Sequence, residues 1–581
     1  MPSRRLCRRP PCERGGETCP SARRTTLGAV PSVAILGPVV LPLAAAAVIA
    51  IFGFAGFDLG RVAAGIGAFS SLAALTAVWV PIRSSVELTL GPLGFGSGFD
   101  MRIDGVTFAF GVMIAAPAAV LLTLQPRVWP QVVVSLLALS AAMAAIESGG
   151  VVLTAIAGGT AATLAVVLLD TEDPRAPRPS WAMLLAGWLA LSWFGVLLQV
   201  RGGTAVYWAV PVATVTGPVF ALLAASALLV SCVFPWRTWP ADLWARPSLR
   251  AAGITIATLY PLGFYLLVRA YEIGHGRYPH ELFNVALAVI GLIAAFAAAA
   301  RAQAAPTRRR FLGEVIPGIG GFALTTISLG TPLGLAAGLI LLATASAMVA
   351  CLALLPDQAG VASLVTIAAA VGLPPGLVFG ARAIGIEATF EAGDFLGLIG
   401  LAGAATWATW MVGGARAIGL PGGRGHPLVE TFPKIALGIA LLTLVAGPAL
   451  ALFETGFANP VAGEMMPGAA NALSGGFLNI VTVSSVLPVV TLLVPLLIFA
   501  VVAYAIVGRS TVKTQARPAL FKVPAAAWIA SMRAALRSLT VPEQYRSILN
   551  VRELEMAAAG AHPVLWLGAL VALGFAVTWK W

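Results

Sequence analysis

Apolar runs of about 20 residues recur along almost the whole chain, separated by short turns that hold Gly, Pro and Arg. A bilayer core requires about 20 apolar residues per spanning helix. Hydrophobic residues make up 59% of the chain and charged residues 10%, which excludes an ordinary soluble globular protein. The runs are also too uniformly apolar for membrane strands, in which polar and apolar residues alternate. The sequence therefore predicts an all-α polytopic membrane protein with about 15 candidate spans.

The net charge of +12 comes mostly from arginines in the loops between these spans. Loops at one side of the predicted membrane hold many more arginines than loops at the other, as the positive-inside rule describes. We therefore expect the arginine-rich side to face the cytoplasm of a bacterial-type inner membrane, and we expect lipid, not nucleic acid, as the charged partner. Residues 1–30 carry seven arginines and would then lie outside. Either this tail reverses the orientation of the first helix, or it is an extension upstream of the true start, and we favour the second interpretation.

Composition and span spacing divide the chain into seven predicted regions. The seven regions are a polar tail at 1–30, three helices at 31–130, five-helix units at 131–270 and 283–413, two helices at 431–507, an amphipathic segment at 509–560 that lies along the membrane surface, and a final transmembrane helix at 563–581. The amphipathic prediction rests on an apolar helical face opposite arginines.

Two of the predicted spans contain prolines that interrupt a helix. Pro235 and Pro240 flank the first break, and Pro374 and Pro375 form the second in the middle of an apolar run. Proline removes a backbone donor and clashes with the preceding turn. Both breaks fall in the fourth helix of a predicted five-helix unit, and matched interruptions of this kind are typical of transporters built from inverted repeats. Unrelated single kinks are the alternative.

Several short stretches resemble the antiporter-like subunits of respiratory complex I, membrane-bound hydrogenases and multisubunit sodium/proton antiporters. They occur in that family's order over residues 85–450. The stretches are Leu90–Phe95 and Met101–Val106 (a hairpin and "R-x-D-G-V"), Pro235–Asp242 (the first break), Ala257-Thr258 with Gly263–Arg269, Arg309-Arg310, Gly321-Phe322, Gly330–Ala337 ("G-T-P-L-G-L-A-A") and Gly372–Pro375 (the "A-G-L-P-P" break).

This resemblance implies a core of about fourteen helices with two inverted five-helix repeats. In the family, a glutamate in the fifth helix, lysines in the seventh, eighth and twelfth helices, and nearby histidines relay protons. Here the matching positions hold uncharged residues, with one exception. The uncharged positions are Gly158 or Gly159, Val230, Thr255, Pro261, Leu341, Ala345 and Val349. Only Arg382 is cationic where the twelfth-helix lysine is expected, and arginine, with a pKa above about 12, does not release a proton as lysine can.

The absence of lysine does not depend on the details of this alignment. Lys434 is the one lysine before residue 510, and we expect it to extend to the cytoplasmic interface. Among carboxylates, Glu147 ends the fourth span and is expected to face water. Glu314, one turn after Arg310, is the carboxylate best placed for a rerouted relay, and Asp394 is expected to favour a helix N-terminus. The proton-path candidates are therefore Glu147, Glu314, Arg382, Asp394 and Lys434.

The sequence contains no P-loop, dinucleotide fingerprint, haem-ligand pair or metal-ligand spacing. We therefore expect no cofactor, no metal and no catalytic residue in this chain. Its partners are expected to be other membrane subunits, with peripheral redox subunits only indirectly. The favoured hypothesis is a membrane-arm subunit of an NADH-quinone oxidoreductase-like or hydrogenase-type assembly, in a structural or coupling role. The alternatives are a stand-alone secondary transporter or channel for a small solute, and a membrane subunit of an inorganic-carbon uptake complex.

Overall fold

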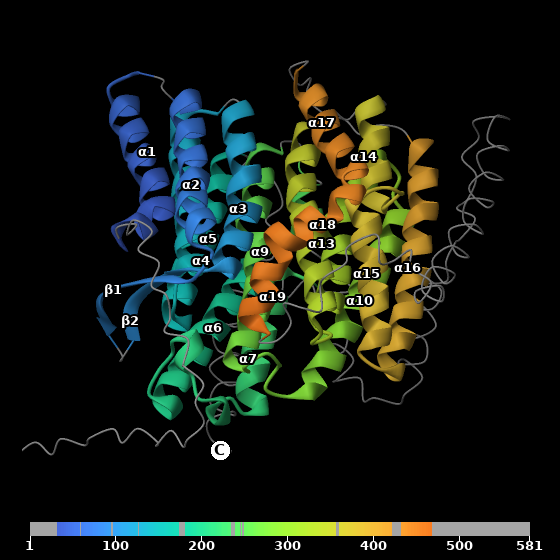
Figure 1. Cartoon of the computed structure of the whole chain (residues 1–581). Coiled ribbons are helices and arrows are strands. Elements are labelled where there is room, and N and C mark those ends of the chain that lie inside the picture. The colour runs from blue at the N-terminus through green and yellow to red at the C-terminus, as the bar shows by residue number, and fades with distance from the viewer. Residues whose placement is uncertain are drawn as a thin grey trace, which may run out of the picture.

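A computed structural model describes residues 32–57, 60–94, 97–125, 127–172, 181–233, 239–244, 246, 249–355, 360–420 and 431–466. The helices stand side by side, and one β-hairpin projects from one flank near α1 and α6 (Figure 1). The tail at 1–30, the second helix of the predicted pair at 431–507, the amphipathic segment and the last predicted span lie outside the described residues.

The first half of the chain contains a hairpin and the helices of the predicted first unit. In chain order the elements are η1 (Ser32–Leu36), α1 (Gly37–Phe54), α2 (Gly60–Ile82), β1 (Val86–Gly94), β2 (Ser97–Ile103), α3 (Gly105–Leu124), α4 (Trp129–Glu147), α5 (Val151–Glu172), α6 (Trp181–Gly202), η2 (Tyr207–Ala209), η3 (Val212–Thr214), α7 (Gly217–Ser231), α8 (Trp239–Trp244) and α9 (Arg250–Ile273).

Every regular element among the described residues of the second half is a helix. Its elements are α10 (Glu281–Gln303), α11 (Arg308–Gly313), α12 (Val315–Ile327), α13 (Pro332–Leu354), α14 (Val361–Val371), α15 (Leu377–Glu391), α16 (Asp394–Ile418), α17 (Thr431–Val445), η4 (Gly447–Ala449), α18 (Leu450–Phe453), the π-helical turn η5 (Glu454–Ala458) and α19 (Asn459–Met465).

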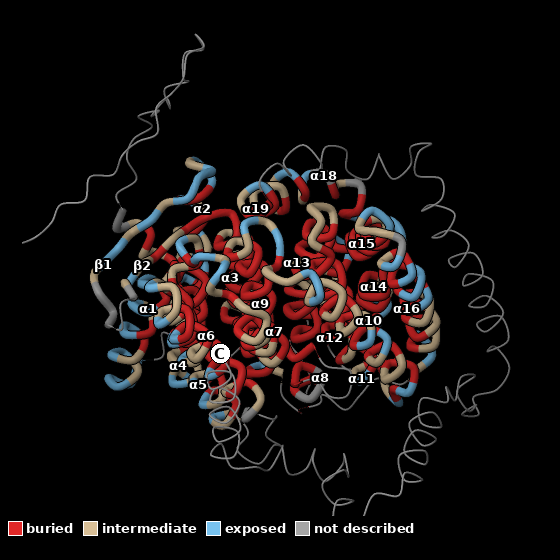
Figure 2. Tube along the Cα trace, turned by 90° about the horizontal axis from the view of Figure 1, so that it is seen from below, coloured by how far each residue is buried: buried red, intermediate tan, exposed pale blue. Residues whose placement is uncertain are grey.

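Ten helices in the described residues are long and apolar enough to cross a bilayer, which confirms the predicted all-α polytopic class. Their burial shows which of them face lipid. The apolar stretch of α9 is wholly buried, whereas only 28% of that of α1 is buried. Figure 2 shows buried residues through α3, α9 and α13 and exposed ones at the rim, on α1 and α16. Exposed apolar side chains on these rim helices are suited to contact lipid tails.

The helices on each side of this centre pack in the same cyclic order. In the first half α4 packs on α5, α5 on α6, α6 on α7, α7 on α9, and α9 closes on α4. In the second half α10, α12, α13, α15 and α16 form the same closed sequence. The first unit crosses the bundle five times between the start of α4 and the end of α9. Because five is an odd number, the second unit begins with α10 at the opposite end of the bundle. On this basis we propose that 131–270 and 283–413 are inverted repeats.

Small residues allow a close approach between α10 and α12. A Cβ on Gly291 would lie 2.6 Å from the Thr325 backbone nitrogen, and a Cβ on Gly321 would lie 2.5 Å from that of Ala295. Membrane helices lack a hydrophobic driving force between them, so their association depends on such close van der Waals packing. No alanine fits at either position without moving the partner backbone.

We predict that Gly291→Ala destabilises the protein by about 1–3 kcal/mol, because the added methyl group forces α10 away from α12. Thermal unfolding of the detergent-purified variant measures this. Gly438→Ala on α17 is the matched control, since a Cβ there meets nothing within 4 Å. Equal melting temperatures for the two variants would show that the α10–α12 contact is not tight.

Candidate functional site: capped helix breaks and a buried charge cluster

The second predicted break lies between α14 and α15. Gly372 adopts a left-handed conformation (φ +80°), and its N–H and that of Leu373 donate to the carbonyls of Ala369 and Ala368. This is the Schellman arrangement, which glycine favours because it has no Cβ. Pro374 and Pro375 follow, and the helix resumes at Leu377. The proline-rich stretch therefore ends one half-helix and begins another.

Two side chains close the carbonyl end of α14. Arg382 Nη1 donates to the Val371 carbonyl at 2.8 Å, and Trp407 Nε1 donates to the same oxygen at 2.9 Å. Arg382 is buried, and its guanidinium lies 4.7 Å from the Phe322 ring centroid and 5.8 Å from that of Trp407. The negative end of the α14 dipole and two aromatic faces thus surround this cation.

The first break is closed in a similar way. Helix α7 ends at Ser231, the next residue, Cys232, adopts the left-handed conformation (φ 52°), and α8 begins at Trp239. Trp239 Nε1 donates to the Val230 carbonyl at 3.3 Å, and its backbone N–H lies 3.4 Å from the Cys232 sulfur. Pro240 is the second residue of α8, and Pro235 lies outside the described residues. At both breaks a tryptophan N–H therefore occupies a carbonyl at the end of the preceding half-helix.

A second cluster of buried charges joins the start of α3 to the end of α9. Asp104 caps α3 by accepting from the Thr107 N–H at 2.8 Å. Its two carboxylate oxygens also accept from Arg269 on α9, at 2.7 and 3.0 Å. Both residues are almost fully buried. The two Nη groups of the Arg269 guanidinium each donate to one carboxylate oxygen. This bidentate pairing fixes the relative orientation of the two side chains and also balances their charges.

The cluster extends to the hairpin and to α19. Arg102 on β2 pairs with Asp104 (3.1 Å) and with Glu272 (2.6 Å) and lies 4.6 Å from the centre of the Trp208 ring. Glu272 also pairs with Arg269, one turn earlier on α9, at 2.8 Å. Glu464 on α19 accepts from the backbone N–H of Gly105 at 2.8 Å. The network thus ties the hairpin, α3, α9 and α19 together.

Asp104 and Glu464, which both lie outside the membrane-spanning helices, have pKa values shifted in opposite directions. Burial opposes ionisation of Asp104, but the charge and hydrogen bonds of Arg269, the charge of Arg102 and the Thr107 N–H hold its pKa below the usual value. Burial raises the pKa of Glu464 to about 7, and the nearby charge of Asp104 adds to this shift. Asp104 is therefore a fixed anion, whereas Glu464 changes its charge near neutral pH.

The structure keeps the predicted proton-path residues apart. Glu147 is fully buried, not facing water as expected, and neither carboxylate oxygen has a hydrogen-bond partner. Glu314 lies between α11 and α12 and pairs with Arg301 of α10 at 2.9 Å. Asp394 is the first residue of α16, and Lys434 is exposed in the first turn of α17.

Two members of the charge cluster, Glu272 and Glu464, were not predicted from the sequence. The three-residue spacing of Arg269 and Glu272 on one helix was the available signal for their pairing. Glu464 gave no comparable signal, because it lies 359 residues from Gly105, the backbone partner of its carboxylate. The resemblance had singled out Arg102, Asp104 and Arg269, but not their contact with one another.

Comparison with known proteins gives structural similarity only. No family model matches the sequence, and no curated protein does. A chain of the Mrp complex from Dietzia sp. DQ12-45-1b aligns with TM-score 0.67 and 19% identity. The alignment covers 90% of the present chain but only 62% of the length of the Mrp chain. A chain of respiratory complex I from Thermus thermophilus aligns with TM-score 0.61 and 18% identity, covering 76% of this chain and 100% of its own length.

A third similar structure is a chain of the membrane-bound sulfane sulfur reductase, an archaeal respiratory membrane complex. It aligns with TM-score 0.61 and 15% identity over 94% of this chain and 99% of its own. All three come from multisubunit membrane assemblies. The chain therefore has the fold of the membrane subunits of Mrp and complex-I-like assemblies, and the resemblance seen in the motifs is confirmed at the level of the fold.

We predict that Asp104→Asn lowers the free energy of unfolding by about 3 kcal/mol or more, because it leaves Arg269 in excess in a buried site while keeping the cap of α3. Thermal unfolding in detergent measures the loss. Glu87→Gln is the control: Glu87 is half-exposed and 3.7 Å from Arg102, so its cost is below about 1 kcal/mol. Similar losses for both variants would contradict a role for burial.

Stability is predicted to fall as pH rises from about 5 to 7.5. Folded Glu464 holds its proton up to about pH 7, whereas an unfolded glutamate releases it near pH 4.5, so folding binds a proton in this window. The change is on the order of 2 kcal/mol after allowance for partial exposure. Unfolding measured against pH should flatten in Glu464→Gln but not in Glu281→Gln, an exposed control; identical slopes would rule out Glu464 as the source.

Proposed function

We propose that this chain is a membrane-arm subunit of a multisubunit respiratory assembly, of the NADH-quinone oxidoreductase or hydrogenase type, and that its role is structural or coupling. Redox chemistry takes place in partner subunits. An inorganic-carbon uptake complex is a further assembly in which this role would be the same. The arginine-rich ends of the helices face the cytoplasm of a bacterial-type inner membrane.

One observation carries the structural role: protein donors already occupy the half-helix end at each break. In transporters with broken helices, unwound carbonyls coordinate the transported cation. Here the Val371 carbonyl accepts from Arg382 and Trp407, and the Val230 carbonyl accepts from Trp239. A cation at Val371 would also lie beside the fixed charge of Arg382. The breaks thus support helix packing and do not favour cation passage.

The buried charges support the same role. Asp104, Arg269, Arg102 and Glu272 form mutually compensating pairs. Arginine retains its proton at every physiological pH, so the pairs hold elements in position and do not relay protons. Because Arg102 belongs to the hairpin and Glu464 to α19, a displacement of either element would be transmitted to α3 and α9. This is the coupling route that we propose.

A rerouted proton path through Glu314 and Arg382 is the alternative within this assembly. Glu314 is largely buried and paired with Arg301, which favours a fixed anion over a carrier. Glu314→Gln is expected to leave proton movement by the assembly unchanged. Loss of proton movement, with the subunits still assembled, would favour the rerouted path.

A stand-alone transporter for an anionic solute is the second candidate function. Arg382 favours it: no carboxylate pairs with this buried cation in the described part of the chain, and its Nε has no hydrogen-bond partner. The α14 carbonyl end and the aromatic rings compensate the charge only in part. An anion could therefore approach Arg382 if a path opened.

Purification in mild detergent, followed by reconstitution, tests the proposal. We expect the tagged chain to copurify with several membrane subunits and iron–sulfur subunits. We also expect liposomes holding the chain alone to show no proton flux above empty liposomes. A monodisperse monomer that transports protons or an anionic solute would overturn the proposal, and abolition of anion flux by Arg382→Gln would establish the second candidate.

A further inference from the structure

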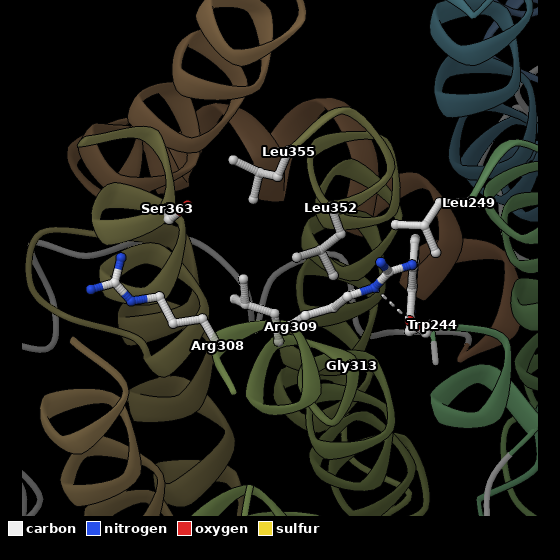
Figure 3. A pocket seen from close by; sticks show the side chains of 9 residues that line it. Trp244, Leu249, Arg308, Arg309, Gly313, Leu352, Leu355 and Ser363 are labelled. Carbon is white, nitrogen blue, oxygen red and sulfur yellow. Dashed lines mark hydrogen bonds between the residues drawn. The ribbon is translucent and has the colours of Figure 1, made fainter. Parts of the chain in front are cut away.

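The hollow between α8, α11, α13 and α14 is too small to hold an organic ligand. Its open space is about 30 Å³, which is room for about one or two water molecules. Figure 3 shows Arg309 extending toward Trp244, whose carbonyl accepts from Arg309 Nε at 3.1 Å. Interiors packed this closely have low compressibility, so a displaced helix moves the elements that touch it. The contacts between elements therefore determine how movement passes through the bundle.

One segment touches both the second helix break and the buried charge cluster. This crossing segment, residues 447–465, consists of η4, α18, η5 and α19 and is continuously helical from Leu450 to Met465. At about 1.5 Å per residue, its helical part is a rod on the order of 20 Å long. It leads from α15 and α17 to α3 and α9 along one face of the bundle (Figure 1, Figure 2). The second half of the chain thereby reaches the first.

At the second break, the start of the crossing segment meets backbone directly. Gly447 packs so closely on Pro375 that a Cβ on Gly447 would overlap the Pro375 carbonyl oxygen and lie 2.7 Å from the carbonyl carbon. The buried Leu450 side chain covers Gly380 of α15, where a Cβ would lie 3.0 Å from a Leu450 methyl carbon. Gly380 lies two residues before Arg382, which closes the α14 carbonyl end. The crossing segment thus packs on the half-helix that positions Arg382.

At the charge cluster, the other end of the crossing segment also meets backbone. A Cβ on Gly105, the first residue of α3, would lie 3.1 Å from the Pro460 carbonyl carbon and 3.1 Å from Glu464 Oε2. Glu464 accepts from the Gly105 N–H at 2.8 Å, next to Asp104, which pairs with Arg269. A close backbone contact and a hydrogen bond therefore both fix this end to the start of α3.

Between its two ends, the crossing segment includes the π-helical turn η5. This turn packs on α13 and α3, and Glu454 and Ala458 within it are buried. π-Helical turns are rare and are frequently found at functional sites. Helices α13 and α3 pack on each other across the two halves, so η5 rests on the boundary between the halves.

We propose that the crossing segment is a strut that couples the second helix break to the charge cluster. This inference rests on the coupling role proposed above and extends its route from α3 and α9 into the second half. Neither Gly447 nor Gly105 has a side chain that could rotate to absorb a shift, so a displacement of α19 moves η4 against Pro375. That movement shifts α15, and with it Arg382, relative to the α14 carbonyl end. Coupling between two sites is reciprocal, so a disturbance at either end should be detected at the other.

Hydrogen–deuterium exchange of the purified full-length chain tests the strut from the break end. Gly447→Ala pushes η4 away from Pro375 and should speed exchange in the first turn of α3 by about five-fold or more, the lower range of typical coupling. Gly463→Ala is the matched control, because a Cβ there meets nothing within 4 Å. It should change this exchange by less than about two-fold. Exchange in α5, at the opposite side of the bundle (Figure 2), should stay the same.

The reverse experiment starts from the charge cluster. Glu464→Ala removes the acceptor of the Gly105 N–H and releases α19 from α3. Exchange of the Gly372 and Leu373 amides, which close the end of α14, should then speed up by a similar factor, although these amides lie at the far end of the crossing segment.

A second variant at the break end introduces no clash. Leu450→Ala removes a contact with α15 and should speed exchange in the first turn of α3 as Gly447→Ala does. Changes confined to the end that carries the substitution would overturn the strut, and so would a uniform increase that includes α5, which indicates general destabilisation. Either result leaves the proposed assembly intact, because copurification tests the assembly separately.

Discussion

The architecture depends on satisfying backbone groups at two places where a helix ends inside the bundle. An unsatisfied peptide group in an apolar interior costs several kcal/mol, so a broken helix persists only if its end is closed. The chain provides this closure with tryptophans from later helices: Trp407 lies 36 residues after Val371, whereas Trp239 lies nine residues after Val230. The breaks are thus built from tertiary contacts and not from the prolines alone.

The same requirement explains which charges remain in the bundle. A buried ionisable group is costly without a partner, and most of those described here have one: Asp104 with Arg269, Glu314 with Arg301, and Arg382 with the α14 carbonyl end. Glu147 is an exception, since both of its oxygens lack a hydrogen-bond partner. The motif resemblance places uncharged residues at most positions of the family's relay groups and Arg382 at one, and this pattern is what led us to propose a structural role.

The fold was largely predictable from sequence, whereas the site was only partly so. Apolar runs marked the spans, and the prolines near Pro235 and Pro374 marked the breaks, because local chemistry determines both. The buried state of Glu147 was missed, since its position at a helix end favours water unless tertiary packing covers it. The contact of Glu464 with α3 depends on a segment that crosses from one half to the other, and no periodicity in the sequence encodes that crossing.

The most direct measurement of the central claim is a cryo-EM map of the purified native assembly that resolves the second break in this subunit. The account predicts Arg382 and Trp407 in contact with the Val371 carbonyl, with no density for an ion or a file of waters beside it. Density for a bound cation or a continuous water chain at this carbonyl, with Arg382 turned away, would contradict the account.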